Sequence, residues 1–263
     1  MADQTWVLTG AAGRIASSVR PSLAERVAKL RLVDLDLVEP AHEREESVVA
    51  DLRDQRAVEA ALVGANGVLH LGALADEADF HDLAEVNILG TYHVFEAARR
   101  TGAERVVFAS TNRVTGFYSR TTLVEPEMPT RPDGFYAVSK IACEALGRLY
   151  SDKFGLRVAS LRIGSFEATP GDERQLSTWL SPSDCEQAFL AAMTAPDLTY
   201  TAIYAVSRNS RRWWDLSAGE AVGFDPQDDA ESHAADVRAA RPEAAGPQGG
   251  HYASPDYSLD RQR

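Results

Sequence analysis

A short apolar run near the start of the chain leads directly into a glycine-rich turn. The run is Trp6 to Thr9, and the turn reads Gly10-x-x-Gly13-x-x-Ala16 before a stretch with helical spacing. Glycines in such a turn let the backbone pass close to a pyrophosphate, and the following helix presents unpaired N–H groups with a partial positive charge. A plain strand-to-helix turn gives the same pattern, so the surrounding chain has to decide between the two.

Further apolar runs alternate with longer mixed stretches. This alternation predicts βαβ units with right-handed crossovers, and hence an α/β fold with a doubly wound (Rossmann) parallel sheet. We expect strands at 6–9, 30–33, 68–71, 105–109 and 158–163, and helices at 83–100 and Tyr136 to Phe154. Ser181 is expected to cap a helix that opens with Pro182. Pro21 conflicts with one long helix from Gly13 to Ala28, so we expect a kink or a break there.

The length of 263 residues suits one α/β domain. We assign 1–224 to a single Rossmann-type domain, with a nucleotide part at about 1–164 and a small C-terminal substrate-binding part contributed mainly by 165–224. The tail, 225–263, is rich in Pro and Ala and holds few large apolar side chains, so it cannot build a core of its own. We expect it to dock on the body or on a neighbouring subunit through its tyrosines, or to be partly flexible.

The charge balance limits the partners. A formal charge of −12 makes the chain a poor general binder of nucleic acid or of an anionic membrane surface. No apolar stretch reaches the roughly 18 residues of a membrane span, and no signal peptide is evident. Cys143 and Cys185 cannot form a disulfide framework, which favours the cytoplasm. The six histidines are never three to five residues apart, so we predict no metal site.

Acidic and small residues follow the predicted strands where a dinucleotide would lie. Asp34 ends the second strand, where a carboxylate meets ribose hydroxyls and repels a 2′-phosphate, so we predict NAD rather than NADP. A loop acid that caps a turn is the simpler reading of Asp34. Asp51 follows a third strand, within reach of adenine. The residues expected to contact the cofactor are Gly10, Ala12, Gly13, Arg14, Ile15, Asp34, Asp51, Leu52, Leu71, Gly72, Ala73, Asn87, Tyr136, Lys140 and Ile163.

A second set of residues has the chemistry of alcohol oxidation. Tyr136 and Lys140 lie four apart on one helix face, and Thr111 ends the fifth strand. A phenol has a pKa near 10 and is a weak base, but a neighbouring ammonium favours phenolate, so we expect Lys140 to lower the pKa of Tyr136. Thr111 would orient a substrate hydroxyl whose proton the tyrosine takes. By itself, Tyr-x-x-x-Lys usually means only a surface helix face.

Taken together, these motifs resemble the extended short-chain dehydrogenase/reductase family, over nearly the whole chain. Within that family the chain is similar to uronate dehydrogenases, which oxidise the anomeric carbon of hexuronates to aldarolactones with NAD. The strings that carry this narrower resemblance are Phe108-Ala109-Ser110-Thr111-Asn112, Arg131-Pro132-Asp133-Gly134-x-Tyr136, Asp152-Lys153-Phe154-Gly155, Arg162-Ile163-Gly164-Ser165, Arg174-x-Leu176-Ser177-Thr178-Trp179, Trp213-Trp214-Asp215 and Gln248-Gly249-Gly250.

The resemblance implies Thr111, Tyr136 and Lys140 as catalytic residues, and a galacturonate, glucuronate or related small sugar acid as substrate. The substrate contacts expected are Ala75, Thr111, Asn112, Arg113, Ser165 and Arg174. A guanidinium at Arg174 suits a carboxylate because it gives two parallel charge-assisted hydrogen bonds. Without the resemblance, Arg174 reads as a solvated loop residue, Ser165 as a small residue at a strand end, and Asn112 as a turn former. The resemblance also implies a homo-oligomer.

Two positions depart from the family pattern. Uronate dehydrogenases tend to have serine where this chain has Ala75, and histidine where it has Arg113. Losing one neutral hydrogen bond costs about 0.5–1.5 kcal/mol, so Ala75 would weaken sugar binding by up to roughly tenfold. Arg113 either adds a second cation to the site or is neutralised by nearby acids, for which Asp76, Glu77 and Asp79 are the candidates.

Two other functions fit the same fold. One is a nucleotide-sugar epimerase or dehydratase, or another small-substrate NAD(P)-dependent oxidoreductase. A dehydratase is disfavoured because Asn112 and Arg113 stand where related enzymes supply carboxylates. An epimerase is disfavoured because only 123 residues follow Lys140. The other is a non-catalytic NAD sensor or scaffold, which would have no need of the set Thr111, Tyr136 and Lys140. We therefore predict a dehydrogenase.

Overall fold

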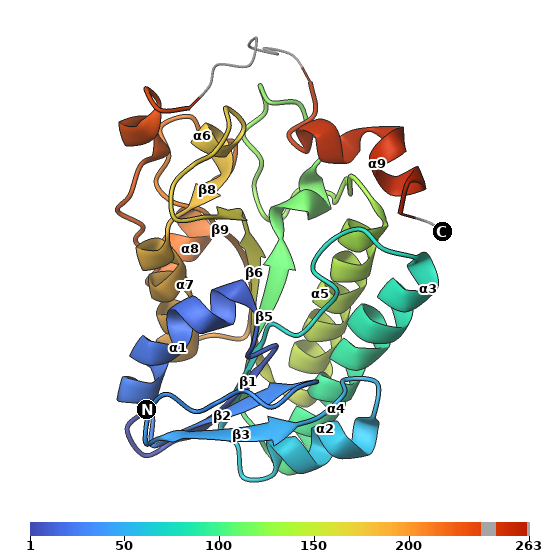
Figure 1. Ribbon diagram of the computed structural model, residues 1–263, viewed down its shortest axis with the longest axis vertical. Coiled ribbons are helices and arrows are strands. Elements are labelled where there is room, and N and C mark those ends of the chain that lie inside the picture. The colour runs from blue at the N-terminus through green and yellow to red at the C-terminus, as the bar shows by residue number, and fades with distance from the viewer. Residues whose placement is uncertain (238–245, 262–263) are drawn as a thin grey trace.

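The computed structural model describes residues 1–237 and 246–261. Its centre is a seven-stranded parallel sheet with the order β3-β2-β1-β4-β5-β6-β9 (Figure 1). The order reverses between β1 and β4, which confirms the predicted doubly wound sheet. The strands are β1 (Thr5–Thr9), β2 (Lys29–Asp34), β3 (Glu45–Val49), β4 (Gly67–His70), β5 (Arg105–Thr111), β6 (Arg157–Ile163) and β9 (Tyr200–Ala205).

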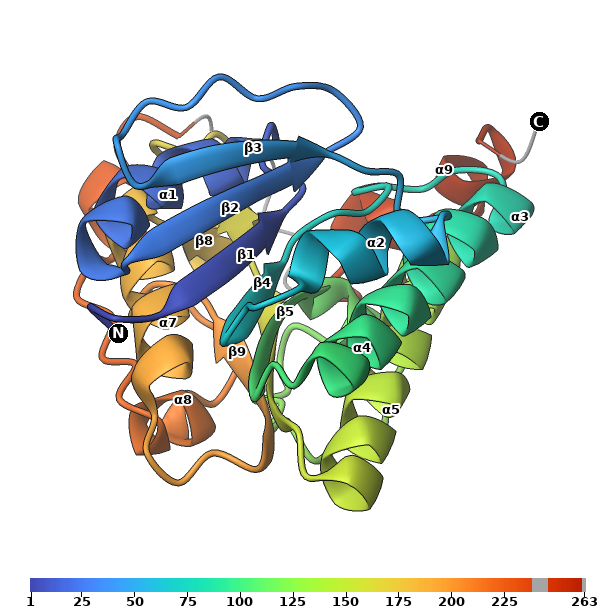
Figure 2. The ribbon, with the colours of Figure 1, turned by 90° about the horizontal axis from the view of Figure 1, so that it is seen from below.

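Helices cover both faces of the sheet (Figure 2). On one face lie α1 (Arg14–Arg26), α7 (Pro182–Thr194) and α8 (Ser217–Ala221), and on the other α2 (Gln55–Leu62), α4 (Gly90–Thr101) and α5 (Phe135–Phe154). Strand residues alternate between the two layers. In β1, Leu8 packs in the cluster that includes α1 and α7, whereas Val7 packs in the cluster that includes α2 and α4. Both faces of the sheet are therefore buried.

Of the kink or break expected at Pro21, the break is absent, because α1 continues through this residue from Arg14 to Arg26. Pro21 is exposed, so its missing N–H and the crowded carbonyl one turn earlier lie on the solvent side. The opposite face buries Val19 and Leu23 completely against the sheet. The apolar area covered there offsets the cost of about 3 kcal/mol that a proline imposes inside a helix.

The other helix predictions are confirmed, with small differences in their bounds. The stretch at 83–100 is helical but not uniform: α3 (Phe80–Asp82) leads into a π-helical segment, η1 (Leu83–Leu89), and then into α4. Helix α5 begins at Phe135, one residue before the prediction, and ends at Phe154 as predicted. The side chain of Ser181 caps α7, with its Oγ accepting a 3.0 Å hydrogen bond from the backbone N of Asp184.

Small elements sit beyond the carboxyl ends of the central strands, at the top of Figure 1. They are the two-stranded sheet β7 (Ser165–Phe166) and β8 (Trp179–Leu180), helices α6 (Gln175–Thr178) and α9 (Pro255–Leu259), and the 3-10 turns η2 (Asn112–Thr115), η3 (Ala230–His233) and η4 (Gly250–Ala253). These elements surround the crevice in which ligands bind in open α/β sheets. Within the described residues, no helix is long and apolar enough to cross a bilayer.

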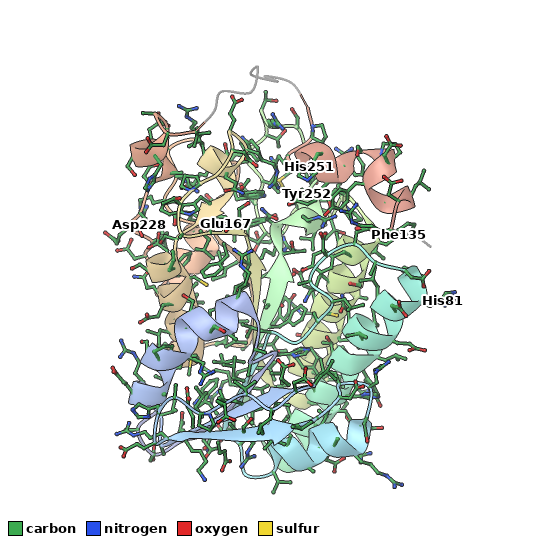
Figure 3. All side chains as sticks on the ribbon, viewed as in Figure 1. His81, Phe135, Glu167, Asp228, His251 and Tyr252 are labelled. Carbon is green, nitrogen blue, oxygen red and sulfur yellow. The ribbon has the colours of Figure 1, made fainter. Side chains whose placement is uncertain are left out.

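Part of the tail packs closely on the body. Pro247 forms an antiparallel bridge with Ser119, and the backbone N of Gln248 donates a 2.8 Å hydrogen bond to the carbonyl of Tyr118. The Gln248 side chain is fully buried, and its Nε2 donates to two backbone carbonyls of the same loop. Figure 3 shows His251 and Tyr252, which follow, above the carboxyl ends of the strands. The part of the tail at 238–245 lies outside the described residues.

Candidate active site

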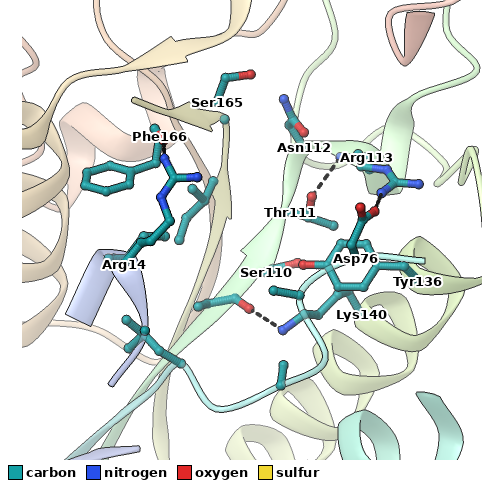
Figure 4. A pocket seen from close by; sticks show the side chains of 18 of the residues that line it. Arg14, Asp76, Ser110, Thr111, Asn112, Arg113, Tyr136, Lys140, Ser165 and Phe166 are labelled. Carbon is teal, nitrogen blue, oxygen red and sulfur yellow. Dashed lines mark hydrogen bonds and ion pairs between the residues drawn. The ribbon is translucent and has the colours of Figure 1, made fainter. Parts of the chain in front are cut away.

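A cavity of about 470 Å³ opens at the carboxyl ends of β1, β4, β5 and β6 (Figure 4). That volume suits a small-molecule ligand. Thr111, Tyr136 and Lys140 lie on one side of it, and Arg14 and Phe166 on the other. The predicted residues that line it are Gly10, Gly13, Arg14, Ile15, Leu71, Ala73, Ala75, Thr111, Asn112, Arg113, Tyr136, Lys140, Ile163, Ser165 and Arg174.

The glycine-rich turn fits a pyrophosphate. Gly10 has a φ of +68°, and a Cβ there would lie 2.6 Å from the backbone N of Gly72, so no larger side chain fits. Gly13 is the N-cap of α1 and provides no side-chain cap, and α1 begins at the cavity, whose lining includes Gly13, Arg14 and Ile15. The turn therefore offers the close backbone approach and the helix terminus that a dinucleotide requires.

The other cofactor predictions lie beside the cavity rather than in its lining. Asp34 Oδ2 accepts a 2.9 Å hydrogen bond from the backbone N of Ala12, which joins the end of β2 to the glycine-rich turn. Asp51 is paired with Arg53 at 2.6 Å, and that pair holds the pKa of the carboxyl below its usual range. Leu52 packs against Gly72. Asp34 and Asp51 thus lie at the carboxyl ends of the neighbouring strands β2 and β3.

Asn87 lies in η1, away from the strand ends, and is buried. Its Oδ1 accepts a 2.8 Å hydrogen bond from the backbone N of Leu74, and its Nδ2 donates to Leu74 O and to Ser139 Oγ. The side chain thus ties the loop after β4 to α5. The structure does not bring Asn87 into the cavity lining.

The predicted catalytic residues meet at the junction of β5 and α5. All three side chains are buried, and the Thr111 hydroxyl helps to lower the pKa of the Tyr136 phenol against the opposing effect of burial. Lys140 donates a 2.9 Å hydrogen bond to the backbone carbonyl of Ala109, and its Nζ lies 5.8 Å from the centroid of the Tyr136 ring. The helix register predicted from the four-residue spacing therefore places both side chains at the cavity.

The electrostatics of Tyr136 differ from the expectation. Burial raises the pKa of this phenol above its usual value, and Arg113 rather than Lys140 is the principal cation that opposes the shift. Lys140 is turned toward the carbonyl of Ala109, whereas the Arg113 guanidinium lies 5.3 Å from the centre of the phenol ring. Burial lowers the pKa of Lys140 from 10.5 to about 8.

Arg113 is a buried hub of ion pairs. It contacts Asp133 at 2.8 Å, Asp76 at 2.9 Å and Glu77 at 3.2 Å. Its backbone lies in η2, two residues after Thr111, and its side chain reaches Asp133, just before α5. Two of the predicted partners are confirmed, but Asp79 is not among them, because its carboxylate accepts from the backbone N of His81 at the start of α3. Arg113 is thus neutralised locally.

Arg174 lines the cavity and is held by the tail. Its Nε donates a 2.7 Å hydrogen bond to the backbone carbonyl of Gln248, and the Tyr252 ring lies 5.3 Å from its guanidinium. This contradicts the alternative of a solvated loop arginine. Nearby, Ser165 Oγ pairs with Thr178 Oγ1 at 2.7 Å. The Nδ2 of Asn112 is buried and has no hydrogen-bond partner among the described residues.

Some lining residues escaped prediction. Glu167 pairs with Arg14 at 2.7 Å, and the carbonyl of Phe166 accepts from the same guanidinium. Tyr252 reaches the cavity from the tail, which agrees with a tail that docks on the body through its tyrosines, although Tyr252 was not predicted as a lining residue. Asp76, considered above only as a neutralising acid, is itself part of the wall. The remaining unpredicted lining residues are Ala16, Ala109, Ser110, Gly164 and Gln175.

Comparisons with known proteins agree with the geometry. Residues 6–181 match the model of the NAD dependent epimerase/dehydratase family. A uronate dehydrogenase of Agrobacterium fabrum is 41% identical over 86% of this chain and 85% of its own length, and one of Pseudomonas syringae pv. tomato is 38% identical over 89% and 85%. A crystal structure of a variant of the Agrobacterium tumefaciens uronate dehydrogenase, complexed with NAD, is 38% identical, covers 96% of this chain and 97% of its own, and has a TM-score of 0.91. The resemblance indicated by the motifs is confirmed.

Proposed function

Because this chain belongs to the NAD dependent epimerase/dehydratase family, and within it to the uronate dehydrogenases, we propose that it uses NAD to oxidise the anomeric hydroxyl of a hexuronate to the lactone. The observation that carries the proposal is the meeting of two sets of side chains on one cavity. Thr111, Tyr136 and Lys140 supply alcohol-oxidation chemistry, and Arg174 supplies a carboxylate partner. Galacturonate and glucuronate are the substrates we expect.

The residues around the glycine-rich turn would hold NAD, which supplies the hydride acceptor when bound. The backbone at Gly10 and Gly13 suits its pyrophosphate, and Asp34 suits a ribose without a 2′-phosphate. Lys140 would contact the nicotinamide ribose. The lining of the cavity runs from the glycine-rich turn to Arg174, which supports a cofactor and a sugar that meet in one crevice.

The proton of the anomeric hydroxyl would be transferred to a side chain of this protein. Thr111 would donate to or accept from the anomeric hydroxyl and so fix its direction, and the Tyr136 phenolate would take its proton as the anomeric C–H bond breaks. Arg113 favours that phenolate against the effect of burial. The products are one lactone, one reduced cofactor and one proton, which Tyr136 later returns to water.

The charges of the wall set the orientation of the sugar acid. Asp76 faces the cavity near Tyr136 and would repel a carboxylate, whereas Arg174 stands apart from it beside α6 and attracts one. The unpartnered Nδ2 of Asn112 would be satisfied by a sugar oxygen. A hexuronate would then lie with its carboxylate at Arg174 and its anomeric end toward Tyr136.

A substrate comparison tests the proposal. The purified protein is mixed with NAD and, in separate reactions, with galacturonate, glucuronate, galactose and glucose, and NADH is followed by absorbance. We expect turnover of at least one uronate, with kcat/KM about 100-fold or more above that of the matching neutral hexose. Absence of NADH formation with every sugar acid at millimolar concentration would contradict the proposed substrate class.

The base is tested separately. Tyr136→Phe keeps the ring and its packing but removes the proton acceptor, so kcat should fall by about 10² to 10⁴-fold while NADH still binds. Val138→Ala, an exposed position in the first turns of the same helix, serves as the control and should keep wild-type kcat. Wild-type turnover in Tyr136→Phe would remove Tyr136 from the mechanism.

The organisation of the chain is proposed on the same basis. We assign 1–164 to the nucleotide part and 165–224 to most of the substrate part, and the contact of Tyr252 with the cavity supports a docked tail. Exposed apolar residues on η1, α4 and α5, among them Leu89, Tyr92 and Leu149, support a homo-oligomer formed through these helices. Two buried free thiols, Cys143 and Cys185, support a reducing compartment such as the cytoplasm.

A further inference from the structure

The helix that carries Tyr136 has no cap of its own. The N-cap position of α5 is Gly134, which has no side chain to accept from the first N–H groups of the helix. A carboxylate from elsewhere in the chain takes that place. Glu77, in the loop after β4, accepts a 2.6 Å hydrogen bond from the backbone N of Phe135 on Oε1, and Oε2 lies 3.4 Å from the backbone N of Tyr136.

The fit between Glu77 and this helix end is tight. A Cβ at position 134 would lie 2.4 Å from Glu77 Oε2, so glycine there is what allows the carboxylate to reach the first turn. The Glu77 side chain has no solvent exposure. A negative charge at a helix N-terminus is stabilised by the helix dipole, and more strongly where water is excluded. The carboxylate therefore fixes the first turn of α5 firmly.

Arg113 connects this cap to the other half of the site. Its Nη2 lies 3.2 Å from Glu77 Oε2, and its Nε lies 2.8 Å from Asp133 Oδ1, on the residue just before Gly134. The backbone N of Arg113 lies 3.3 Å from Thr111 Oγ1, to which it donates. A continuous chain of polar contacts thus runs from Thr111 through Arg113 and Glu77 to the backbone of Tyr136.

We propose that Glu77 is a positioning residue for Tyr136, which caps the catalytic helix from a distant loop and sets the phenol against the substrate hydroxyl. The inference rests on the proposed function in that it takes Tyr136 as the base. Glu77 touches neither the cavity nor the reacting atoms, so its effect is on geometry. Displacing a reacting group by about 1 Å can cost about 10²-fold in rate. The glycine-rich turn at the other end of the cavity is not touched by Glu77, so most of the cofactor affinity should be retained.

Three variants test the assignment. Glu77→Gln keeps the size but removes the charge and turns an amide N–H group toward Arg113 or the helix N–H groups. Glu77→Asp keeps the charge with a shorter reach. Asp79→Asn is the matched control, because Asp79 lies in the same loop and caps α3 through the backbone N of His81, and no described contact joins it to α5. For each, kcat and KM for the sugar acid and the Kd of NADH are measured.

We expect kcat of Glu77→Gln to fall by about tenfold or more, with KM and the NADH Kd within about threefold of wild type. Glu77→Asp should recover part of the loss, and Asp79→Asn should match wild type. Wild-type kcat in Glu77→Gln would overturn the proposal. So would a loss of NADH affinity in step with kcat in both Glu77 variants, because that pattern indicates general unfolding rather than misplacement of one side chain.

Amide hydrogen exchange gives a readout that does not depend on turnover. In Glu77→Gln the backbone amides of Phe135 and Tyr136 should exchange about tenfold faster or more, while amides in the middle of α5 keep their wild-type rates. If the wild-type protein oxidised no sugar acid but this local change were observed, the proposed function would fail and the cap would stand. Unchanged exchange at both amides would overturn the cap whatever the activity.

Discussion

The Nε atom of Arg174 donates a 2.7 Å hydrogen bond to the backbone carbonyl of Gln248, which lies 74 residues further along the chain. Gln248 is itself anchored by the loop that runs from Tyr118 to Thr122. One edge of the guanidinium is therefore fixed, and within the described residues nothing accepts from its two Nη groups. Those groups are the pair that a substrate carboxylate would engage.

Replacing Arg174 should weaken the binding of the sugar acid but not the binding of the cofactor. In Arg174→Gln the side chain still donates one hydrogen bond but loses the charge and the paired donors, which contribute about 1.5–3 kcal/mol to a carboxylate. The KM for the uronate should rise by about 10- to 100-fold, and the Kd of NADH, measured by fluorescence titration, should stay unchanged.

The control for that experiment is Arg211→Gln, an arginine that pairs with Glu231 at the surface and lies outside the cavity. It should leave the uronate KM as in wild type. An unchanged KM in Arg174→Gln would mean that the carboxylate is held elsewhere in the cavity.

Cofactor preference should depend on Asp34. The Asp34 side chain accepts from the backbone N of Ala12 and from its own neighbour, Leu35, so its carboxylate is held at the edge of the glycine-rich turn. Asp34→Asn keeps the shape but removes the charge that repels a 2′-phosphate. The ratio of kcat/KM for NAD to that for NADP should fall by about tenfold or more, whereas Asp36→Asn, exposed two residues later, should leave the ratio unaltered. Retention of the wild-type ratio in Asp34→Asn would assign the selectivity to another residue.

The buried ammonium of Lys140 should make the stability of the protein depend on pH. Burial lowers its pKa from 10.5 to about 8, so between these two values the unfolded chain binds a proton that the native protein does not. The free energy of unfolding therefore gains a contribution that rises with pH through this window. At neutral pH the buried charge costs about 3 kcal/mol relative to an uncharged side chain of similar length.

Lys140→Met provides the comparison, because methionine has no titratable group. Urea unfolding without cofactor at pH 7 and pH 10 gives the free energy of unfolding of wild type minus that of Lys140→Met. This difference should increase by about 2 to 3 kcal/mol between the two conditions. A difference that is constant or that falls would show that Lys140 is not desolvated in the native protein.

The elements with local signals could be predicted from the sequence. Strands β1, β2, β4, β5 and β6 and helix α5 follow from apolar runs and periodicity, whereas β9 at the edge of the sheet was not predicted. The four-residue spacing of Tyr136 and Lys140 places both on one face of a helix whatever packs around it. The turn at Gly10 is likewise a local feature. Pro21 shows the limit, because whether a helix continues through a proline depends on how much its opposite face buries, and that is decided by the sheet.

The contacts that couple distant segments could not be predicted. Asp133 rather than Asp79 pairs with Arg113 because η2 and the start of α5 are brought together by the fold, not because of their spacing in the chain. The position of Gln248 beneath Arg174 depends on a bridge between the tail and the loop at Ser119. The pKa of Tyr136 is raised by burial instead of lowered as expected, because desolvation depends on the whole surrounding structure.

The transfer of a labelled hydrogen tests the central claim most directly. Galacturonate or glucuronate that carries deuterium at the anomeric carbon is oxidised with NAD, and the reduced cofactor and the product are analysed by NMR and mass spectrometry. The account predicts one deuterium at C4 of the nicotinamide for each lactone formed, and none left at the former anomeric carbon. Deuterium retained in the sugar, or lost to water without reduction of the cofactor, would contradict oxidation at the anomeric carbon.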